Sequence, residues 1–146
     1  LGFTALPLPN LILDGGVQYL DAQYSEGELE QFNVVLAPDW SGSLAATLVL
    51  LVAAGNAYLR TDYSFMGDHY TNPTYQPPEA KQDRELVNLR LGWRNDSWDA
   101  AIWARNIADE SYSTLAAAPF LLTGITAQFL QPPRTYGVTV RYSFQR

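Results

Sequence analysis

The sequence lacks cysteine and has only one histidine among its 146 residues. The absence of cysteine excludes disulfide bonds and thiolate metal sites, and a single histidine supplies too few ligands for a zinc site. Charged residues make up only 16% of the chain, against about 25% in an ordinary soluble domain. The net charge of −6 argues against nucleic-acid binding, which needs a basic surface.

The chain also lacks a long apolar run. A membrane-spanning helix needs about 18 consecutive apolar residues, whereas the longest run here covers residues 44–54 and contains Thr47. No basic leader or initiator methionine opens the sequence, so we expect a fragment of a longer protein. Nucleophile-elbow, zinc-protease and phosphate-loop motifs are all missing, which predicts no enzyme and no cofactor.

Alternating side chains are the clearest positive feature, above all near the C-terminus. One face of the predicted strand there is apolar, and its members are Tyr136, Val138, Val140, Tyr142 and Phe144. The opposite face is small or polar, with Thr135, Gly137, Thr139, Arg141 and Ser143. A period of two indicates a β-strand, and aromatic residues at both strand ends are typical of transmembrane β-barrels.

Six segments show this strand pattern, at residues 11–24, 43–52, 56–66, 86–94, 98–106 and 134–146. Short turns at 53–55 and 95–97 alternate with long connections at 25–42, 67–85 and 107–133. Outer-membrane barrels have short periplasmic turns and long extracellular loops. We therefore predict an all-β fold, an antiparallel up-and-down meander of about six strands that forms part of a transmembrane β-barrel.

Charges fall on one face of the predicted strands. The residues expected to face the barrel lumen are Arg60, Asp62, Arg90, Arg94, Asp99, Trp103, Arg105 and Arg141. A charge on the lipid face would cost about 2–4 kcal/mol at the bilayer midplane. Alternation alone does not distinguish this arrangement from a soluble β-barrel with its apolar face inward. Aromatic strand ends and unequal connections favour the membrane.

Three linked motifs resemble the C-terminal end of a TonB-dependent outer-membrane receptor. They are NLRLGW at 88–93, WDAAIWARNIADESY at 98–112 and PRTYGVTVRYSF at 133–144. The resemblance implies a 22-stranded barrel plugged by an N-terminal domain, which imports iron–siderophore complexes or similar scarce ligands. Residues 1–146 would then be the C-terminal barrel segment, with the plug and about sixteen earlier strands outside this chain. Asn106 and Asp109 would turn the chain at the outer rim.

This resemblance also implies partners and a location. The location is the outer membrane of a Gram-negative bacterium, and the partners are its lipid, the barrel-assembly machinery, the plug domain and the TonB energy-coupling system. The ligand-facing candidates in the long connection are Asp68, His69, Tyr70 and Tyr75. The assembly signal would comprise Gly137, Val140, Tyr142 and Phe144.

Two alternatives stay open at this point. One is a small soluble β-barrel that binds an apolar ligand, and the other is a barrel fragment that folds alone as a structural module. Six strands would leave two unpaired edges, and exposed edges predict self-association.

Overall fold

The structure is a computed structural model that describes residues 1–25, 34–72, 81–120, 125–144. These residues form β1 (Gly2–Leu8), β2 (Leu11–Tyr19), β3 (Trp40–Val52), β4 (Gly55–Tyr70), β5 (Lys81–Arg94), β6 (Trp98–Arg105), β7 (Ser113–Phe120), β8 (Ile125–Leu130) and β9 (Thr135–Tyr142). Within the described residues, no helix is long and apolar enough to span a membrane.

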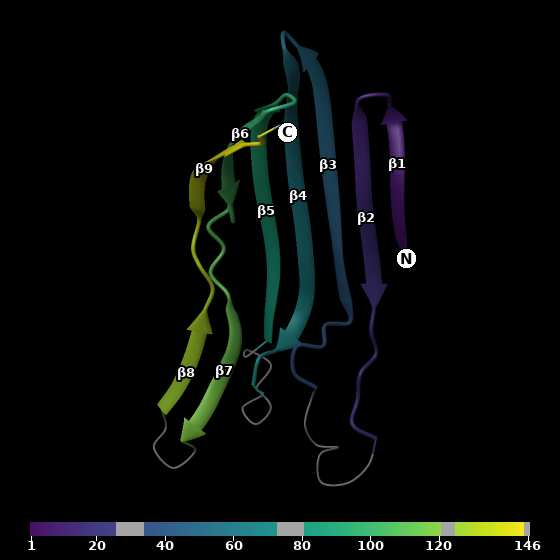
Figure 1. The fold of residues 1–146 in the computed structure, drawn as a ribbon. Coiled ribbons are helices and arrows are strands. Elements are labelled where there is room, and N and C mark those ends of the chain that lie inside the picture. Colours follow the sequence, from purple (N-terminus) through teal and green to yellow (C-terminus); the bar gives the residue numbers. More distant parts are fainter. Residues whose placement is uncertain (26–33, 73–80, 121–124, 145–146) are drawn as a thin grey trace.

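Seven of the strands form one antiparallel sheet in the order β1-β2-β3-β4-β5-β6-β9 (Figure 1). Strands β7 and β8 form a separate hairpin between β6 and β9. The prediction of an all-β antiparallel meander is therefore confirmed. All three short turns lie at one end of the strands, and the described residues of the three long connections lie at the opposite end. These two ends are called the short-turn end and the loop end below.

Strand β1 was not predicted from the sequence. Pro7 lies within it and Pro9 follows it, and the two prolines obscure the alternation. Proline cannot donate a ladder hydrogen bond, so it is tolerated in an edge strand, and β1 is an edge of this sheet. A two-residue turn at 9–10 joins β1 to β2 and adds a third short turn to the two expected.

Several strand boundaries also differ from the sequence prediction. The first predicted strand ends at Tyr19 rather than at residue 24, and the last ends at Tyr142. The connection expected at 67–85 is shorter, because β4 continues to Tyr70 and β5 begins at Lys81. Polar residues occupy both faces of these extensions, and a register shift lies between Met66 and His69. Because of these two features, the extensions of β4 and β5 do not show the period of two from which strands are predicted.

The register of the sheet aligns apolar side chains into rows that cross the strands. One row contains Leu11, Leu48, Leu59, Leu91, Ile102 and Val138. The adjacent residues on the other face form rows of small and charged side chains, such as Thr47, Arg60 and Arg90. These two sides are called the apolar face and the polar face below.

Burial is inverted relative to a soluble protein. The buried hydrophobic residues are Ala45, Tyr58 and Ala101, and register places all three on the polar face. On the apolar face, Ile102 is 57% exposed and Val138 is 71% exposed. A soluble barrel would bury these aliphatic side chains. In the described residues, the apolar face is therefore the more exposed of the two faces of the sheet.

Candidate functional site

The polar face carries a hydrogen-bonded cluster near the short-turn end. Tyr58 donates its hydroxyl hydrogen to an Asp99 carboxylate oxygen 2.9 Å away. Arg90 donates from Nε to the Tyr58 hydroxyl at 3.1 Å, and its guanidinium lies 3.8 Å from Asp99. Arg94 lies over the Tyr58 ring, 5.3 Å from its centroid. The tyrosine thus bridges three neighbouring strands, β4, β5 and β6.

A glycine opposite this tyrosine makes the cluster possible. Gly92 is the cross-strand partner of Tyr58, and a Cβ atom built at Gly92 would lie 2.4 Å from the phenol ring. Gly137 has the same relation to Trp103, whose ring would lie 2.5 Å from a Cβ. Each glycine therefore lets an aromatic ring lie flat across the polar face.

We expect Gly92→Ala to destabilise the folded barrel by about 1–3 kcal/mol, the usual cost of overpacking. The new methyl group would displace the Tyr58 ring and break its bonds to Asp99 and Arg90. Denaturant unfolding of the protein in phospholipid vesicles measures the effect. Gly2→Ala is the control, because its Cβ would meet only the Gly15 backbone oxygen, at an ordinary contact distance of 3.6 Å. Equal stability of the two variants would contradict the role given to Gly92.

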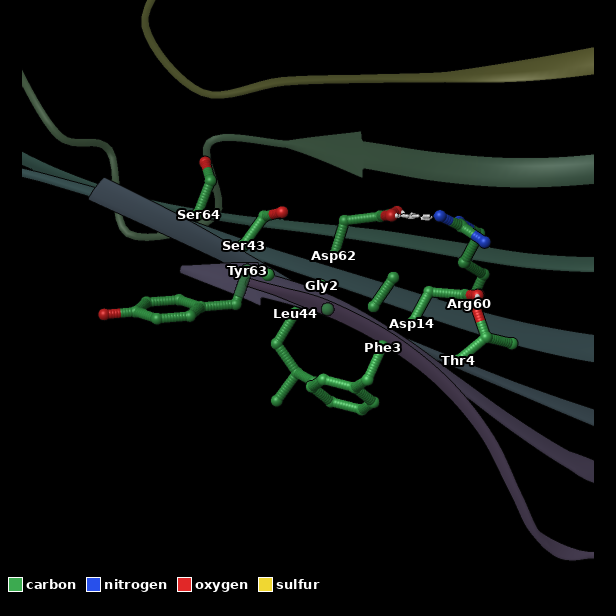
Figure 2. Close-up of a pocket in the computed structure, with 13 residues that line it drawn as sticks. Gly2, Phe3, Thr4, Asp14, Ser43, Leu44, Arg60, Asp62, Tyr63 and Ser64 are labelled. Atoms are coloured by element: carbon green, nitrogen blue, oxygen red, sulfur yellow. Dashed lines mark hydrogen bonds and ion pairs between the residues drawn. The ribbon is translucent and has the colours of Figure 1, made fainter. Parts of the chain in front are cut away.

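A second group of polar residues lies across β1 to β4 (Figure 2). Arg60 and Asp62 form an ion pair with a shortest N–O distance of 2.6 Å, and Arg60 also donates to the Thr47 hydroxyl at 3.2 Å. Thr4 donates to Asp14 at 2.9 Å. Both members of the ion pair are well exposed, so its contribution to stability is small.

Thr4, Asp14, Arg60 and Asp62 border a hollow of about 680 Å³ on the polar face. Its floor is a cross-strand row of small residues, Gly2, Gly16, Ser43 and Ser64. Figure 2 shows Phe3, Leu44 and Tyr63 projecting from the opposite side of the same strands. The small residues of this row leave open space above the polar face.

The residues predicted to face a lumen all lie on the polar face. Trp103 donates from its indole nitrogen to the Thr139 hydroxyl at 3.1 Å, and the Arg105 guanidinium lies 5.1 Å from its ring centroid. Arg94 and Arg141 are the two cross-strand partners of Asp99. The structure thus joins the eight residues into clusters around Asp62, Asp99 and Trp103.

A separate hollow of about 390 Å³ lies at the loop end. It brings together three of the four predicted ligand-facing residues, Asp68, His69 and Tyr70. Tyr75, the fourth, lies outside the described residues. The hollow is also lined by Asp21, Asp39 and Lys81. Among the described residues, no group of three or more His, Cys, Asp or Glu side chains is placed to hold a metal ion.

His69 belongs to β4 and is only 6% exposed, so it is not part of a solvated loop. Its Nδ1 lies 2.8 Å from the Gly67 carbonyl oxygen, which can only accept a hydrogen bond. Nδ1 therefore carries a proton, and in the neutral ring Nε2 is an acceptor. Nearby, the Lys81 ammonium lies 5.5 Å from the Tyr70 ring centroid.

The turn after β6 is held by Asn106, as the sequence suggested. Its backbone has a φ of 52°, and its amide side chain bonds to both the N–H and the C=O of Glu110, at 2.9 and 2.8 Å. Asp109 has a φ of 60° and accepts a hydrogen bond from the Arg134 backbone at 2.8 Å. The turn therefore connects the end of β6 to the start of β9.

Aromatic residues gather at both ends of the sheet. At the short-turn end, the Tyr142 ring lies 4.7 Å from Trp98 and 4.7 Å from Phe144. At the loop end, Tyr19 lies 5.0 Å from Trp40. Of the predicted assembly signal, Val140 and Tyr142 project from the apolar face of the edge strand β9, whereas Gly137 lies under Trp103.

Comparison with known proteins adds information on the fold. No family model matches the sequence. The ferric yersiniabactin uptake receptor of Yersinia pestis matches 97% of the chain with a TM-score of 0.82 and 16% identity. The ferric preacinetobactin receptor of Acinetobacter baumannii matches 98% with a TM-score of 0.72 and 22% identity. The chain covers 22% and 21% of these receptors, about a fifth of their length.

Over nearly the whole chain, the strands are arranged as in a segment of the transmembrane β-barrels of these receptors. The expected fold class is thereby shown. Identity is below 25% in both comparisons, and it is the arrangement of the strands that is shared.

Tyr58 is the main polar-face residue whose role the sequence did not reveal. Alternation places it on the polar face, but its contact with Asp99 joins residues 41 positions apart. The register between β4, β5 and β6 is needed to bring them together. The short turn at 95–97 fixes the register of β5 and β6. Strands β4 and β5 are joined by a long connection, so the pairing of Tyr58 with Gly92 could not be counted outward from a short turn.

Proposed function

We propose that this chain is part of an outer-membrane receptor that imports iron–siderophore complexes or similar scarce ligands, and that it has no catalytic role. The observation that carries the proposal is the inverted sheet, whose exposed face is apolar and whose charges share the other face. The likeness to two siderophore receptors over nearly the whole chain supports the same conclusion.

The dimensions of the apolar face suit an outer membrane. Asn56, Arg94 and Asp99 form one cross-strand row near the short-turn end. Trp98 and Tyr142 form the next row toward that end, which on β4 is the level of Gly55. Ten residue steps separate Gly55 from Phe65 near the loop end, or about 33 Å along the strand. A strand tilt of about 40° reduces this to about 25 Å, the height of the apolar band in outer-membrane barrels. The loop-end hollow would then lie outside the bilayer.

Strand direction supports the proposal that the chain is one segment of a larger barrel. Each neighbouring pair in the seven-stranded sheet is antiparallel, so β1 and β9 run in the same direction. Pairing these two edges, within one chain or between two chains of the same orientation, would create a parallel contact. Bacterial transmembrane barrels are antiparallel throughout. An odd number of further strands must therefore separate β9 from β1.

A 22-stranded barrel meets this condition, since fifteen strands would remain rather than about sixteen. We propose that residues 1–146 are the C-terminal segment of such a barrel, with the lumen on the polar side. A plug domain and the TonB energy-coupling system would belong to the complete receptor. The same parity argument disfavours the self-association of co-oriented copies that unpaired edges alone would suggest.

Ligand contact is proposed for Asp68, His69 and Tyr70, which line the loop-end hollow. Tyr75 is proposed as a fourth contact from its place in the sequence alone, since it lies outside the described residues. His69 offers a ring nitrogen as acceptor, and Tyr70 offers a phenol beside a lysine ammonium. Such polar groups around a concave site can orient a ligand. Because Asp68, His69 and Tyr70 lie beyond the proposed membrane band, a ligand arriving from outside would meet them first.

Uptake of iron-loaded ligand tests the proposed function. Cells of a receptor-deletion strain carrying the full-length receptor should accumulate radioactive iron from ferric yersiniabactin, ferric preacinetobactin or another ferric siderophore in a panel, and only when the membrane is energised. His69→Ala combined with Asp68→Asn should reduce uptake at least tenfold without changing the amount of folded receptor. Absence of uptake for the whole panel, with no growth defect of the deletion strain under iron limitation, would contradict the proposal.

Assembly is proposed to depend on the last strand. Its edge could be recognised by strand addition, in which the backbone provides affinity and alternate side chains provide specificity. We expect Phe144→Ala with Tyr142→Ala to lower insertion of the receptor in cells several-fold more than it lowers refolding in detergent. Heat-modifiable migration on gels measures both. Equal losses in the two assays would mean that these rings only contribute to the aromatic band.

A further inference from the structure

The apolar face carries a hollow of about 530 Å³ where β5, β6 and β9 lie side by side. Ala104 contributes only a methyl group to its lining, and the cross-strand neighbours of Ala104 are Leu89 on β5 and Tyr136 on β9. In the next row toward the short-turn end, β6 carries the larger Ile102, which also lines the hollow. A methyl group between a leucine and a tyrosine thus leaves space on the apolar face.

The lining of this hollow suits a hydrocarbon chain. Every side chain that lines it is aliphatic or aromatic, and Gly137 adds only backbone. Its volume is within the range of about 300–1,000 Å³ that is typical of ligand pockets. In the proposed orientation the apolar face is the lipid side, so the occupant of the hollow comes from the bilayer. A flexible acyl chain fills such a space, whereas an empty space would deprive the lining side chains of dispersion contacts.

The hollow lies in the outer half of the proposed membrane band. Ile102 is level with Leu59, near the midpoint of the membrane-spanning stretch of β4, and Ala104 lies two residues nearer the loop end. Arg134 comes directly before β9, four residues from Val138 in the Ile102 row. Four residue steps span about 13 Å along a strand, or about 10 Å of height at a tilt of about 40°. Half of a band of about 25 Å is about 12 Å, so Arg134 lies near the level where lipid head groups begin.

Arg134 extends the apolar face of β9 with a cation. Exposure alternates from residue 134 to residue 138, with Arg134, Tyr136 and Val138 exposed and the two residues between them half-buried. Arg134 is therefore in phase with the residues that line the hollow. Its guanidinium donates to the Ile107 carbonyl oxygen at 3.4 Å, while Asp109 accepts from its backbone N–H. Among the described residues, the Arg134 guanidinium forms no ion pair.

We propose that this hollow binds an acyl chain of lipid A, the phosphorylated glucosamine lipid of the outer leaflet, and that Arg134 binds one of its phosphates. The proposal rests on the proposed function, because it takes the apolar face as the lipid side and the loop end as the external side. The apolar chain matches the lining of the hollow, and a planar guanidinium matches a phosphate in two parallel hydrogen bonds. Head groups of the inner leaflet lie at the short-turn end, far from Arg134.

The test measures lipid binding by the full-length receptor, refolded in detergent without bacterial lipid. Native mass spectrometry with purified diphosphorylated lipid A reports how many lipids bind and how tightly. Ala104→Leu fills the hollow and should weaken the tightest binding of lipid A at least tenfold. Ala100→Leu is the matched control, because Ala100 lies on the same face of β6, four residues nearer the short-turn end, and does not line the hollow. The control should change the affinity less than twofold.

Removal of the cation tests the head-group contact. Arg134→Gln should weaken binding of lipid A at least fivefold and leave binding of dephosphorylated lipid A unchanged, whereas Arg134→Lys should keep most of the affinity. Equal affinity of wild type, Ala104→Leu and Arg134→Gln for lipid A would overturn the proposal. Equal affinity of wild type for lipid A and for phosphatidylglycerol would also overturn it, because the site would then not select the lipid of the outer leaflet.

A photo-crosslinking amino acid at position 104 supplies a second measurement should Ala104→Leu not fold. In cells, crosslinks to lipid A that are several-fold more abundant at 104 than at 100 would support the proposal, and equal yields at the two positions would overturn it. Iron uptake by wild type is measured in parallel. Lipid A binding that depends on position 104, without uptake, would contradict the proposed transport function alone. Uptake with no dependence of lipid binding on position 104 would contradict this proposal alone.

Discussion

An arginine at position 102 is expected to destabilise the bilayer-inserted receptor by about 2–4 kcal/mol. Ile102 is 57% exposed and lies in the apolar row between Leu91 and Val138. In the proposed orientation this row is near the middle of the membrane, where a guanidinium group has no water or counter-charge. Unfolding by guanidinium chloride in phospholipid vesicles would measure the change in free energy.

Ser64→Arg is the matched control for this substitution. Ser64 lies on the polar face, beside the 680 Å³ hollow, which has room for a larger side chain. We expect the control to change stability by less than about 1 kcal/mol, the usual range for exposed sites. A larger loss for Ser64→Arg than for Ile102→Arg would mean that the two faces of the sheet had been assigned the wrong way round.

Replacing Asn106 with alanine is expected to cost about 2–4 kcal/mol. The alanine would have to keep a φ near 52°, which is unfavourable for a residue without a polar side chain. It would also leave the backbone N–H and C=O of Glu110 without the two bonds that the asparagine amide supplies. Asn106 is only 6% exposed, so water replaces these bonds poorly.

Two further variants separate these causes. Asn106→Gly relieves the backbone strain and still removes both hydrogen bonds, whereas Asn106→Asp keeps the acceptor for Glu110 N–H and loses the donor. Both should fall between wild type and alanine in a denaturant titration followed by tryptophan fluorescence. If all three variants matched wild type, the turn would contribute nothing to the connection between β6 and β9.

Alternation predicted six of the seven strands of the sheet, because each of them has an apolar face. Strand β5 is an example, with Val87, Leu89, Leu91 and Trp93 alternating with polar residues. The same signal fails where both faces are polar, as in β4 beyond Met66, and where proline interrupts the pattern, as in β1. The hairpin of β7 and β8 was missed because β7 has no polar residue from Leu115 to Phe120 and β8 is only six residues long.

The sequence placed the charged residues on one face but did not pair them. Arg60 and Asp62 are two residues apart in one strand, so their contact follows from local geometry. The cluster of Tyr58, Arg90 and Asp99 depends on the register of three strands. His69 was expected in a loop, and only the extension of β4 shows that it is buried. Contacts within a strand were therefore predictable, and contacts between strands needed the fold.

The inverted sheet is tested most directly by the accessibility of spin labels in the full-length receptor in bilayers. This segment contains no cysteine, so single labels can be introduced at 91, 102 and 138 on the apolar face and at 90 and 139 on the polar face. We predict high oxygen accessibility for the first set, because lipid dissolves oxygen, and low oxygen accessibility for the second. Equal accessibility of both sets, or higher values at 90 and 139, would contradict the account.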